Sequence, residues 1–384
     1  MQHPIIASLA LSVAQVTDKT WWTFIELTAS DGTTGFGEAT LTGRERDLEQ
    51  AARALFPRFL HRPVAEGEPV VALSAVSHLP TAAILSGIDH ALWDLRAKHA
   101  SQSLAQCLGD VRHPEVALYA NINRRTSART PADFAASARA AVAAGFTAIK
   151  IAPFDEAALY GKQADPTTER AAIERGLERI AATRAAVGAS IDLMVDCHWR
   201  LNTCASLALL DELTPYALYW LECPVPEIPE QMDSIRRIRS RANDLGIRLA
   251  GCEEAIGVGG FRPFLDAGAY DVMMPDVKYV GGVREVLAVA ALLDRYHVEF
   301  SPHNPSGPIA HAVSLQLSAI VPNFRRLEMQ FDETPVFDAL LAQRPPSPHQ
   351  GRARLSDRPG HGATLDVDTV RLYQTLEYRI AADD

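Results

Sequence analysis

The stretch IDLMVDCHWRLN, residues 191–202, begins like a buried strand and ends in polar residues. Apolar Leu193 and Val195 alternate along it, and Asp196 and His198 follow, two residues apart. Because successive side chains of a strand point to opposite faces, residues two apart share a direction. We therefore expect a carboxylate and an imidazole side by side on one face, at the C-terminal end of an otherwise apolar strand.

The same pattern, a short apolar strand and then an amphipathic helix, repeats from about Ala117 onward. Eight segments have the strand pattern: ALYANIN, TAIKIA, IDLMVD, LYWLE, RLAGCE, DVMMP, VEFSP and RRLEMQ. Eight strands separated by seven helices predict βα units in a parallel sheet, and the number eight favours a closed barrel over an open doubly wound sheet. Helix starts agree, since Asp165 is placed to cap a helix with Pro166 at its first position. The expected fold class is α/β, a modified TIM barrel of the (β/α)7β type.

The residues before and after the barrel have different patterns. Residues 5–39 contain short alternating strands with turn signals, notably SDGTTGFGE, which indicate an antiparallel hairpin or meander. A helical pattern follows in AAILSGIDHALWDLRAKHA, whose apolar residues recur at spacings of three and four. The end of the chain is richer in Pro, Gly and polar residues. The predicted organisation is an α+β capping domain at 1–114, a barrel at 115–335 and a C-terminal segment at 336–384 that returns to the capping domain.

Charge and cysteine content argue against a nucleic-acid-binding, membrane-binding or disulfide-stabilised protein. The 384 residues include 37 Lys and Arg against 47 Asp and Glu, a formal net charge of −10, with no block of like charge. A general attraction to nucleic acid or to an anionic membrane is therefore not expected. Five cysteines without close pairing predict reduced thiols and a cytoplasmic protein rather than a disulfide framework. The apolar run at residues 5–16 is too short to span a bilayer, and we interpret it as a strand.

A polar residue stands at or just past the end of each expected strand. These residues are Asn123, Lys150, Asp196, Glu222, Glu253, Asp276, His303 and Glu328. In a barrel of this type the active site lies at the C-terminal ends of the strands. The eight residues are therefore predicted to form one ring around one cavity.

Three carboxylates in this ring, Asp196, Glu222 and Glu253, follow three adjacent strands. Carboxylates that converge in a low-dielectric cavity repel one another and take up protons unless a cation neutralises them. Oxygen ligands without histidine or thiolate favour Mg²⁺ over Zn²⁺, with Mn²⁺ as a possible substitute. The trio thus predicts a divalent metal site.

Cysteines and glycines beside the trio have simpler interpretations. Strand alternation turns Cys197, Cys223 and Cys252 away from the cavity, so we expect them to be small core residues. The glycines of IGVGGF, residues 256–261, give only part of a phosphate-loop pattern and are interpreted as loop glycines.

With these motifs the chain resembles the enolase superfamily, specifically its mandelate racemase and muconate lactonizing enzyme group. The resemblance covers almost the whole chain and is carried by GFGEA, GIDHALWDLRAK, GFTAIKIA, VDCHWR, WLECPVPE, LAGCEE, MMPDVKYVGGV, SPHNPSGPIAHAVSLQ and RPGHG. It implies a metal on the acidic trio and removal of a proton α to a carboxylate, with the metal stabilising the enediolate. It also implies that Asp276 orients His303 as general base, and that Glu328 lies by the substrate carboxylate and donates or shares a proton with the enolic oxygen.

One departure from the family pattern restricts the chemistry. Many relatives carry Lys-x-Lys after the second strand with the second lysine as base, but the matching triplet here is Lys150, Ile151 and Ala152. The resemblance therefore disfavours a two-base racemase and leaves His303 as the single base. We expect Lys150 to contact the substrate carboxylate or a metal ligand, and the alternative is a structural ion pair.

His198 acquires a role from the same resemblance. Galactonate and mannonate dehydratases of the superfamily are similar in carrying Asp-x-His after the third strand, where the histidine protonates a departing hydroxyl. Hydroxide is a poor leaving group, and an imidazolium supplies the proton it needs near neutral pH. The alternative for His198 is a structural histidine.

The resemblance thus implies a Mg²⁺-dependent acid-sugar dehydratase that acts on an aldonate or aldarate and yields a 2-keto-3-deoxy acid. The alternatives are an epimerase or cycloisomerase that uses the same intermediate, and a binding barrel without turnover. Specificity is expected from the TDKTWW and LTGRER loops and from Asn121, Asn123 and Arg124, while Arg44, Arg46 and Arg124 stay outside the catalytic set. The expected partner is a small carboxylate, and we expect a homo-oligomer.

Overall fold

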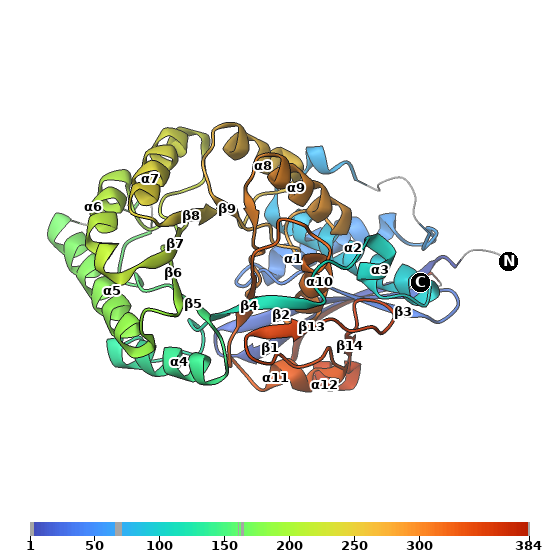
Figure 1. Ribbon diagram of the computed structural model, residues 1–384. Helices are drawn as coiled ribbons and strands as arrows, with labels where there is room; N and C mark the ends of the chain where they lie inside the picture. The colour runs from blue at the N-terminus through green and yellow to red at the C-terminus, as the bar shows by residue number, and fades with distance from the viewer. Residues whose placement is uncertain (1–3, 66–70, 160, 163–164, 383–384) are drawn as a thin grey trace.

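A parallel barrel and a separate antiparallel sheet make up the fold of the computed structural model (Figure 1), which describes residues 4–65, 71–159, 161–162 and 165–382. The α/β fold class with a capping domain is confirmed. The domain boundaries at 114/115 and 335/336 stay predictions, and the outermost residues of the predicted domains lie outside the described ranges.

The barrel sheet contains eight parallel strands in the order β10-β9-β8-β7-β6-β5-β4-β11. Their bounds are β4 Glu115–Asn121, β5 Ala148–Ile151, β6 Asp192–Asp196, β7 Leu218–Glu222, β8 Arg248–Gly251, β9 Val272–Met273, β10 Glu299–Phe300 and β11 Leu327–Gln330. The circle closes through a parallel bridge between Phe300 and Phe324, where Phe300 N donates to Asn323 O at 3.0 Å. All strand ends of one polarity therefore meet at one face.

Seven helices follow the first seven barrel strands and form the outer layer (Figure 1). They are α4 Pro131–Ala143, α5 Pro166–Val187, α6 Thr203–Leu213, α7 Met232–Asp244, α8 Gly257–Asp266, α9 Val283–Arg295 and α10 Pro308–Ser318. Asp165 caps α5 as predicted, because its side chain accepts hydrogen bonds from the N–H groups of Thr167 and Thr168. Apolar side chains fill the layer between helices and sheet, and Tyr119, Met194 and Trp220 fill the barrel interior below the carboxyl ends.

The interpretation of IGVGGF as a loop is wrong, because its glycines belong to the first turns of α8. Gly257 has a φ of +61°, and a Cβ there would lie 3.1 Å from the carboxylate of Glu285. That carboxylate accepts the N–H of Val258 at 2.7 Å and so satisfies a free donor at the start of the helix. The glycine therefore serves a helix start and not a phosphate loop.

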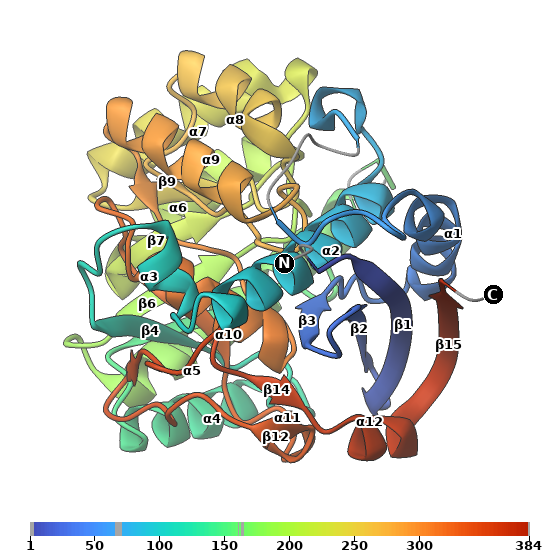
Figure 2. The same ribbon diagram turned by 90° about the vertical axis from the view of Figure 1, so that its right-hand side faces the viewer.

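The capping domain is built on a four-stranded antiparallel sheet in the order β15-β1-β2-β3. Its strands are β1 Ile6–Thr17, β2 Thr20–Ala29, β3 Thr34–Glu38 and β15 Gln374–Ala381, and its helices are α1 Glu45–Leu55, α2 Leu79–His99 and α3 Leu104–Leu108. Figure 2 shows β15 alongside β1, so the end of the chain completes the N-terminal sheet. A Cβ at Gly37 would lie 1.8 Å from the carbonyl oxygen of Gly87, so glycine at this position lets β3 lie directly on α2.

The C-terminal segment also contacts the barrel. It contains α11 Val336–Ala339, β12 Leu341–Gln343, β13 Arg352–Arg354, β14 Thr364–Leu365 and α12 Val367–Tyr373. Strand β13 pairs antiparallel with β4, and β12 pairs with β14. The described residues also form the short 3-10 turns η1 Phe56–Arg58, η2 Leu73–Ala75, η3 Thr214–Tyr216 and η4 Pro229–Gln231. Over the described residues, no helix combines the length and apolar character that a membrane span requires.

Candidate active site

The three predicted metal ligands lie together at the carboxyl ends of the barrel strands. Asp196 ends β6, Glu222 ends β7, and Glu253 follows β8 by two residues. One carboxylate oxygen from each lies within 4.8 Å of the others, and all three side chains are buried. The strand-end spacing therefore brings together the trio that the sequence indicated.

The positively charged groups around the trio do not fully balance its negative charge. Burial raises the pKa of Glu222 to about 8, and burial followed by the charge of Asp196 raises the pKa of Glu253 well above its usual value. Oε2 of Glu253 is buried and has no hydrogen-bond partner among the described residues. A divalent cation would supply both the missing charge and the missing partner, so the three oxygen donors fit such an ion.

Lys150 lies inside this carboxylate cluster. Its side chain is 1% exposed, and Nζ lies 2.6 Å from Glu222 Oε1, 3.0 Å from Glu328 Oε1 and 3.8 Å from Asp196 Oδ2. Burial alone would lower the pKa of Lys150, but the charges of Glu222 and Glu328 outweigh it and hold the pKa well above the usual value. The lysine is therefore a fixed cation that joins the trio to the last barrel strand.

Glu328, on β11, accepts hydrogen bonds from two further donors. Asn121 Nδ2 lies 2.7 Å from Oε1, and the N–H of Asn304 lies 2.9 Å from Oε2. Burial would raise the pKa of Glu328, but the charge of Lys150 and these hydrogen bonds lower it. The carboxylate form is favoured, and this form accepts protons but cannot donate one.

Asn121, rather than Asn123, joins the ring from the first barrel strand, because β4 ends two residues earlier than predicted. Asn123 Oδ1 instead accepts the N–H of Ala152 at 2.6 Å. Arg129 binds the carbonyl oxygen of Ala152 at 2.5 Å and forms two hydrogen bonds with Asp155. Ala152, which stands where relatives carry the second lysine, is thus fixed through its backbone N–H and carbonyl oxygen.

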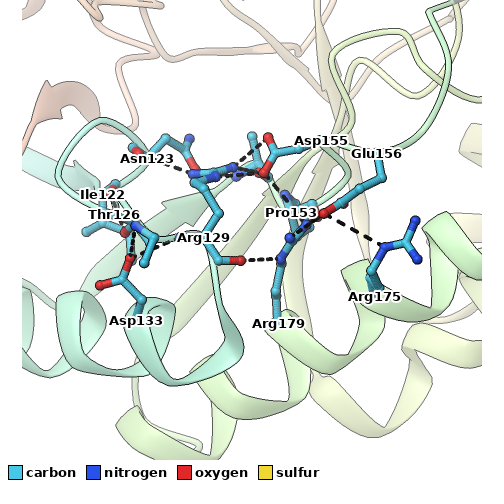
Figure 3. Close-up of polar contacts among 12 residues, drawn as sticks. Ile122, Asn123, Thr126, Arg129, Asp133, Pro153, Asp155, Glu156, Arg175 and Arg179 are labelled. Carbon is cyan, nitrogen blue, oxygen red and sulfur yellow. Dashed lines mark hydrogen bonds and ion pairs between the residues drawn. The ribbon is translucent and has the colours of Figure 1, made fainter. Parts of the chain in front are cut away.

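Figure 3 shows the polar network that fixes this part of the barrel rim, with Arg129 lying between Asn123 and Asp155. Arg179 reaches from α5 and donates to the carbonyl oxygen of Pro153 at 2.6 Å and to both oxygens of Glu156. The two arginines therefore tie the loop after β5 to the loop after β4. Lys150 lies in β5, two residues before Ala152 of this loop.

Asp276 and His303 form the predicted pair. His303 Nδ1 lies 2.7 Å from Asp276 Oδ2, and Nε2 lies 3.6 Å from Glu253 Oε2. The carboxylate thus engages one ring nitrogen, while the other faces the acidic trio. Sequence reasoning missed Lys278, a 1% exposed lysine whose Nζ lies 2.6 Å from the same Asp276 oxygen and 2.5 Å from Ser306 Oγ.

His198 contacts Asp196 directly, but through a turn instead of strand alternation. Strand β6 ends at Asp196, and His198 and Trp199 have φ values of +48° and +54°, a region that non-glycine residues rarely adopt. His198 Nε2 lies 2.9 Å from Asp196 Oδ2, and its side chain is 48% exposed. The charge of Asp196, ahead of the opposing effect of burial, raises the pKa of His198. The imidazolium form is therefore favoured at the open side of the cluster.

The three cysteines beside the trio are buried, and burial raises the pKa of the Cys197, Cys223 and Cys252 thiols well above the usual value. Their expected role as small core residues agrees with this burial. A thiolate site is therefore not indicated.

The arginines left outside the catalytic set lie at the rim and on the surface. Arg44 and Arg46 form exposed pairs with residues three further along α1. Arg124 pairs with Glu333 at 3.1 Å, and Glu333 also accepts the hydroxyl of Thr20 from the capping domain. The TDKTWW loop thus contacts the barrel rim.

Two family models match the chain, and together they span most of it. The model described as "Enolase C-terminal domain-like" matches residues 133–369, and "Mandelate racemase / muconate lactonizing enzyme, N-terminal domain" matches residues 2–109. The chain therefore belongs to the mandelate racemase and muconate lactonizing enzyme group of the enolase superfamily, as its motifs predicted.

Several relatives that are named as dehydratases are similar to the chain in sequence. It is 31% identical over 378 residues to D-gluconate dehydratase of Thermoproteus tenax, covering 94% of this chain and 72% of the relative. It is 30% identical to D-xylonate dehydratase of Haloferax volcanii, covering 75% and 69%. It is 27% identical to D-galactonate dehydratase of Ralstonia pickettii, covering 78% and 75%.

Solved structures show the same fold. An enolase superfamily member from Salmonella Typhimurium matches with a TM-score of 0.87 at 23% identity, covering 98% of this chain and 100% of the other. The 3,6-anhydro-D-galactonate cycloisomerase from Zobellia galactanivorans matches with a TM-score of 0.84 at 23% identity, covering 97% and 100%. At these identities the likeness concerns the fold alone.

Proposed function

We propose that the protein dehydrates an acid sugar in a Mg²⁺-dependent reaction, by loss of the C2 proton and the C3 hydroxyl, to give a 2-keto-3-deoxy acid. The observation that carries the proposal is the placement of His303 Nε2, which lies 3.6 Å from Glu253 of the acidic trio while Asp276 engages Nδ1. A base beside a cation site is the arrangement needed to remove a proton α to a carboxylate.

His303 is the proposed base. Asp276 holds the Nδ1 proton and so presents Nε2 as the acceptor, which then takes the C2 proton. Asp196, Glu222 and Glu253 would hold the metal, which when bound supplies positive charge against the negative charge that develops on the substrate carboxylate. Mn²⁺ is an expected substitute.

His198 is the proposed acid. The charge of Asp196 favours its imidazolium form, and its 48% exposed side chain lies where a substrate hydroxyl can reach it. It donates a proton to the departing C3 hydroxyl, which leaves as water. The enol that remains tautomerises to the keto acid.

Lys150 and Glu328 are proposed to act as a charged pair. Lys150 carries positive charge at the centre of the cluster, so it attracts the substrate carboxylate and holds Glu222 in place. Glu328, favoured as the carboxylate, orients Lys150 and the backbone of Asn304, next to His303. This assignment replaces the proton-sharing role that the resemblance implied for Glu328.

The names of the similar relatives support elimination, since those relatives are D-gluconate, D-xylonate and D-galactonate dehydratases. An epimerase or cycloisomerase using the same intermediate is the alternative, and a binding barrel is a further one. Ala152 argues against an epimerase that uses two bases, because an alanine supplies no second base. The proposed ligand is a small carboxylate, and cytoplasmic location and homo-oligomer formation stay predictions.

A library of aldonic and aldaric acids, incubated with protein and Mg²⁺ and assayed for 2-keto acid, tests the proposal. We expect product from at least one acid, and loss of product in both His303→Asn and His198→Asn. Full activity in His198→Asn would remove the assigned acid. A ligand that raises thermal stability without turnover of any acid would favour the binding barrel.

A further inference from the structure

Glu38 is a fully buried carboxylate that joins the capping domain to the loop of the proposed base. It ends β3 and reaches the start of α10, where Oε1 accepts the N–H of Gly307 at 2.7 Å and Oε2 accepts the N–H of Ala310 at 2.9 Å. These N–H groups belong to the first turn of a helix, which lacks intrahelical acceptors for them. Two segments about 270 residues apart in sequence are thus connected by one side chain.

The contact requires glycine at position 307. A Cβ there would lie 2.9 Å from Glu38 Oε2 and 3.0 Å from Trp22, so a larger residue would displace the carboxylate. Burial raises the pKa of Glu38, while the backbone of Ala310 and the charge of Lys278 oppose that rise. Burying the Glu38 carboxylate costs free energy, and its hydrogen bonds to the start of α10 offset part of that cost.

The loop that Glu38 holds, residues 303–307, carries the proposed base. His303 begins it, and Ser306 Oγ near its end accepts a hydrogen bond from Lys278 Nζ at 2.5 Å. Lys278 in turn contacts Asp276 Oδ2, the oxygen that His303 Nδ1 contacts at 2.7 Å. The loop is therefore fixed at one end by the Asp276 contacts and at the other by Glu38.

Thr40 forms a second connection from the same segment. Its hydroxyl donates to Glu38 Oε1 at 2.8 Å and accepts the N–H of Thr23 at 2.9 Å. Its carbonyl oxygen accepts the hydroxyl of Tyr279 at 3.0 Å, and the Tyr279 ring lies 6.5 Å from the His303 ring. Residues 38–40 therefore contact both loops that supply the Asp276 and His303 pair.

We propose that Glu38 is a positioning residue of the active site: through residues 303–307 it sets the placement of His303 relative to Asp276, and Thr40 assists through Tyr279. The capping domain then contributes to the geometry of the base as well as to the walls of the site. Misplacement of a catalytic group by about 1 Å costs roughly 10²-fold in rate, so the loss of this contact is measurable. The activity part of the test rests on the proposed function, whereas the structural part does not.

Asp94 provides a matched control. It is also a fully buried carboxylate on the capping side, and it accepts the N–H of Phe36, two residues before Glu38 in β3, at 3.1 Å. Its other hydrogen bonds within the described part of the chain come from Lys98 and from the N–H of His361. Asp94→Asn thus perturbs the same strand without a contact to the base.

The structural test compares histidine ring signals by NMR in protein labelled with ¹⁵N-histidine, with the His303 signal assigned by its loss in His303→Asn. In Glu38→Gln we expect the His303 Nδ1 signal to move or broaden, and in Asp94→Asn to stay unchanged. An unchanged signal in Glu38→Gln, or an equal change in both variants, overturns the proposal. If Glu38→Gln does not fold, Thr40→Val replaces it, with Thr40→Ser expected to keep the wild-type signal.

The kinetic test uses any acid that the wild-type protein turns over. We expect kcat of Glu38→Gln to fall about 10- to 100-fold with KM within about twofold, while Asp94→Asn keeps kcat within about threefold. Equal losses of kcat in the two variants indicate a merely structural effect and contradict the proposal. If no acid is turned over, the proposed function fails, and the NMR comparison still decides the role of Glu38.

Discussion

Lys278 and His303 contact the same oxygen of one carboxylate. Lys278 Nζ lies 2.6 Å from Asp276 Oδ2, and His303 Nδ1 lies 2.7 Å from it. Burial would raise the pKa of Asp276, but the charge of Lys278 and the His303 hydrogen bond keep it lowered. Asp276 therefore stays ionised and satisfies two groups at once, a base and a buried cation.

Replacement of Asp276 separates these two tasks. Asp276→Asn is expected to lower kcat by about 10³-fold, because the tautomer of His303 is no longer fixed. It also leaves Lys278 buried without its partner, at a cost of about 3 kcal/mol in the free energy of unfolding. Adding Lys278→Met should restore the stability, measured by urea unfolding, but not the activity. Recovery of activity in the double variant would contradict the role of Asp276.

Lys150→Met tests the cation inside the acidic cluster. Without Lys150, no positive charge separates Glu222 from Glu328. We therefore expect the free energy of unfolding of the metal-free protein to fall by about 3 kcal/mol. Added Mg²⁺ then replaces part of the missing charge, so the Mg²⁺-induced rise in Tm should be larger than in the wild type. The control is Lys98→Met, which removes another lysine from a buried carboxylate, Asp94. Equal Mg²⁺ effects in all three proteins would speak against Lys150 as part of the site.

Metal binding should depend on Glu253 more than on its half-buried neighbour Glu227. Glu253→Gln removes a proposed ligand and is expected to weaken Mg²⁺ or Mn²⁺ binding by at least about tenfold, measured by calorimetry. Glu227 accepts the Tyr270 hydroxyl at 3.0 Å and lies outside the trio. Glu227→Gln should therefore bind metal within about threefold of wild type, and equal losses in both variants would dismiss the trio as a specific site.

Two buried histidines, His90 and His311, should each contribute a loss of stability as the pH falls from 7 to 5, while the raised pKa of Glu222 acts in the opposite sense. Burial lowers the pKa of His90 to about 3 and that of His311 to about 4, from 6.5. A folded-state pKa below the unfolded value means that the unfolded chain binds more protons, so the contribution of each histidine to stability is complete above pH 6.5 and decreases below it. Each histidine should cost about 2 kcal/mol at pH 5. His90→Gln should remove about half of this joint loss in urea unfolding, and an unchanged loss would contradict it.

The barrel and its strand-end residues could be predicted because they follow a repeated local pattern. A strand that must be buried on both faces is apolar, so a polar residue at its end, as in Glu222 or His303, stands out against its neighbours. The acidic trio follows from the same spacing. What the spacing fixes is the strand from which each residue comes, and not the direction of its side chain.

The residues that were missed depend on contacts between distant segments. Lys278 lies in a loop, and nothing local distinguishes a buried lysine from a solvated one. In the sequence Glu38 is an ordinary residue at the end of a strand, and only the fold shows that it contacts the start of α10. His198 was assigned by strand alternation, but a positive φ after Asp196 ends the strand and turns the side chain back.

Elimination of water from an acid sugar is tested most directly by incubation in D₂O with Mg²⁺ and the acids that name the relatives. We expect a 2-keto-3-deoxy acid with solvent deuterium at C3, and we expect His198→Asn to form none while still exchanging the C2 proton of its substrate. Deuterium at C2 of recovered substrate, without any 2-keto acid from the wild-type protein, would contradict elimination and favour the epimerase alternative.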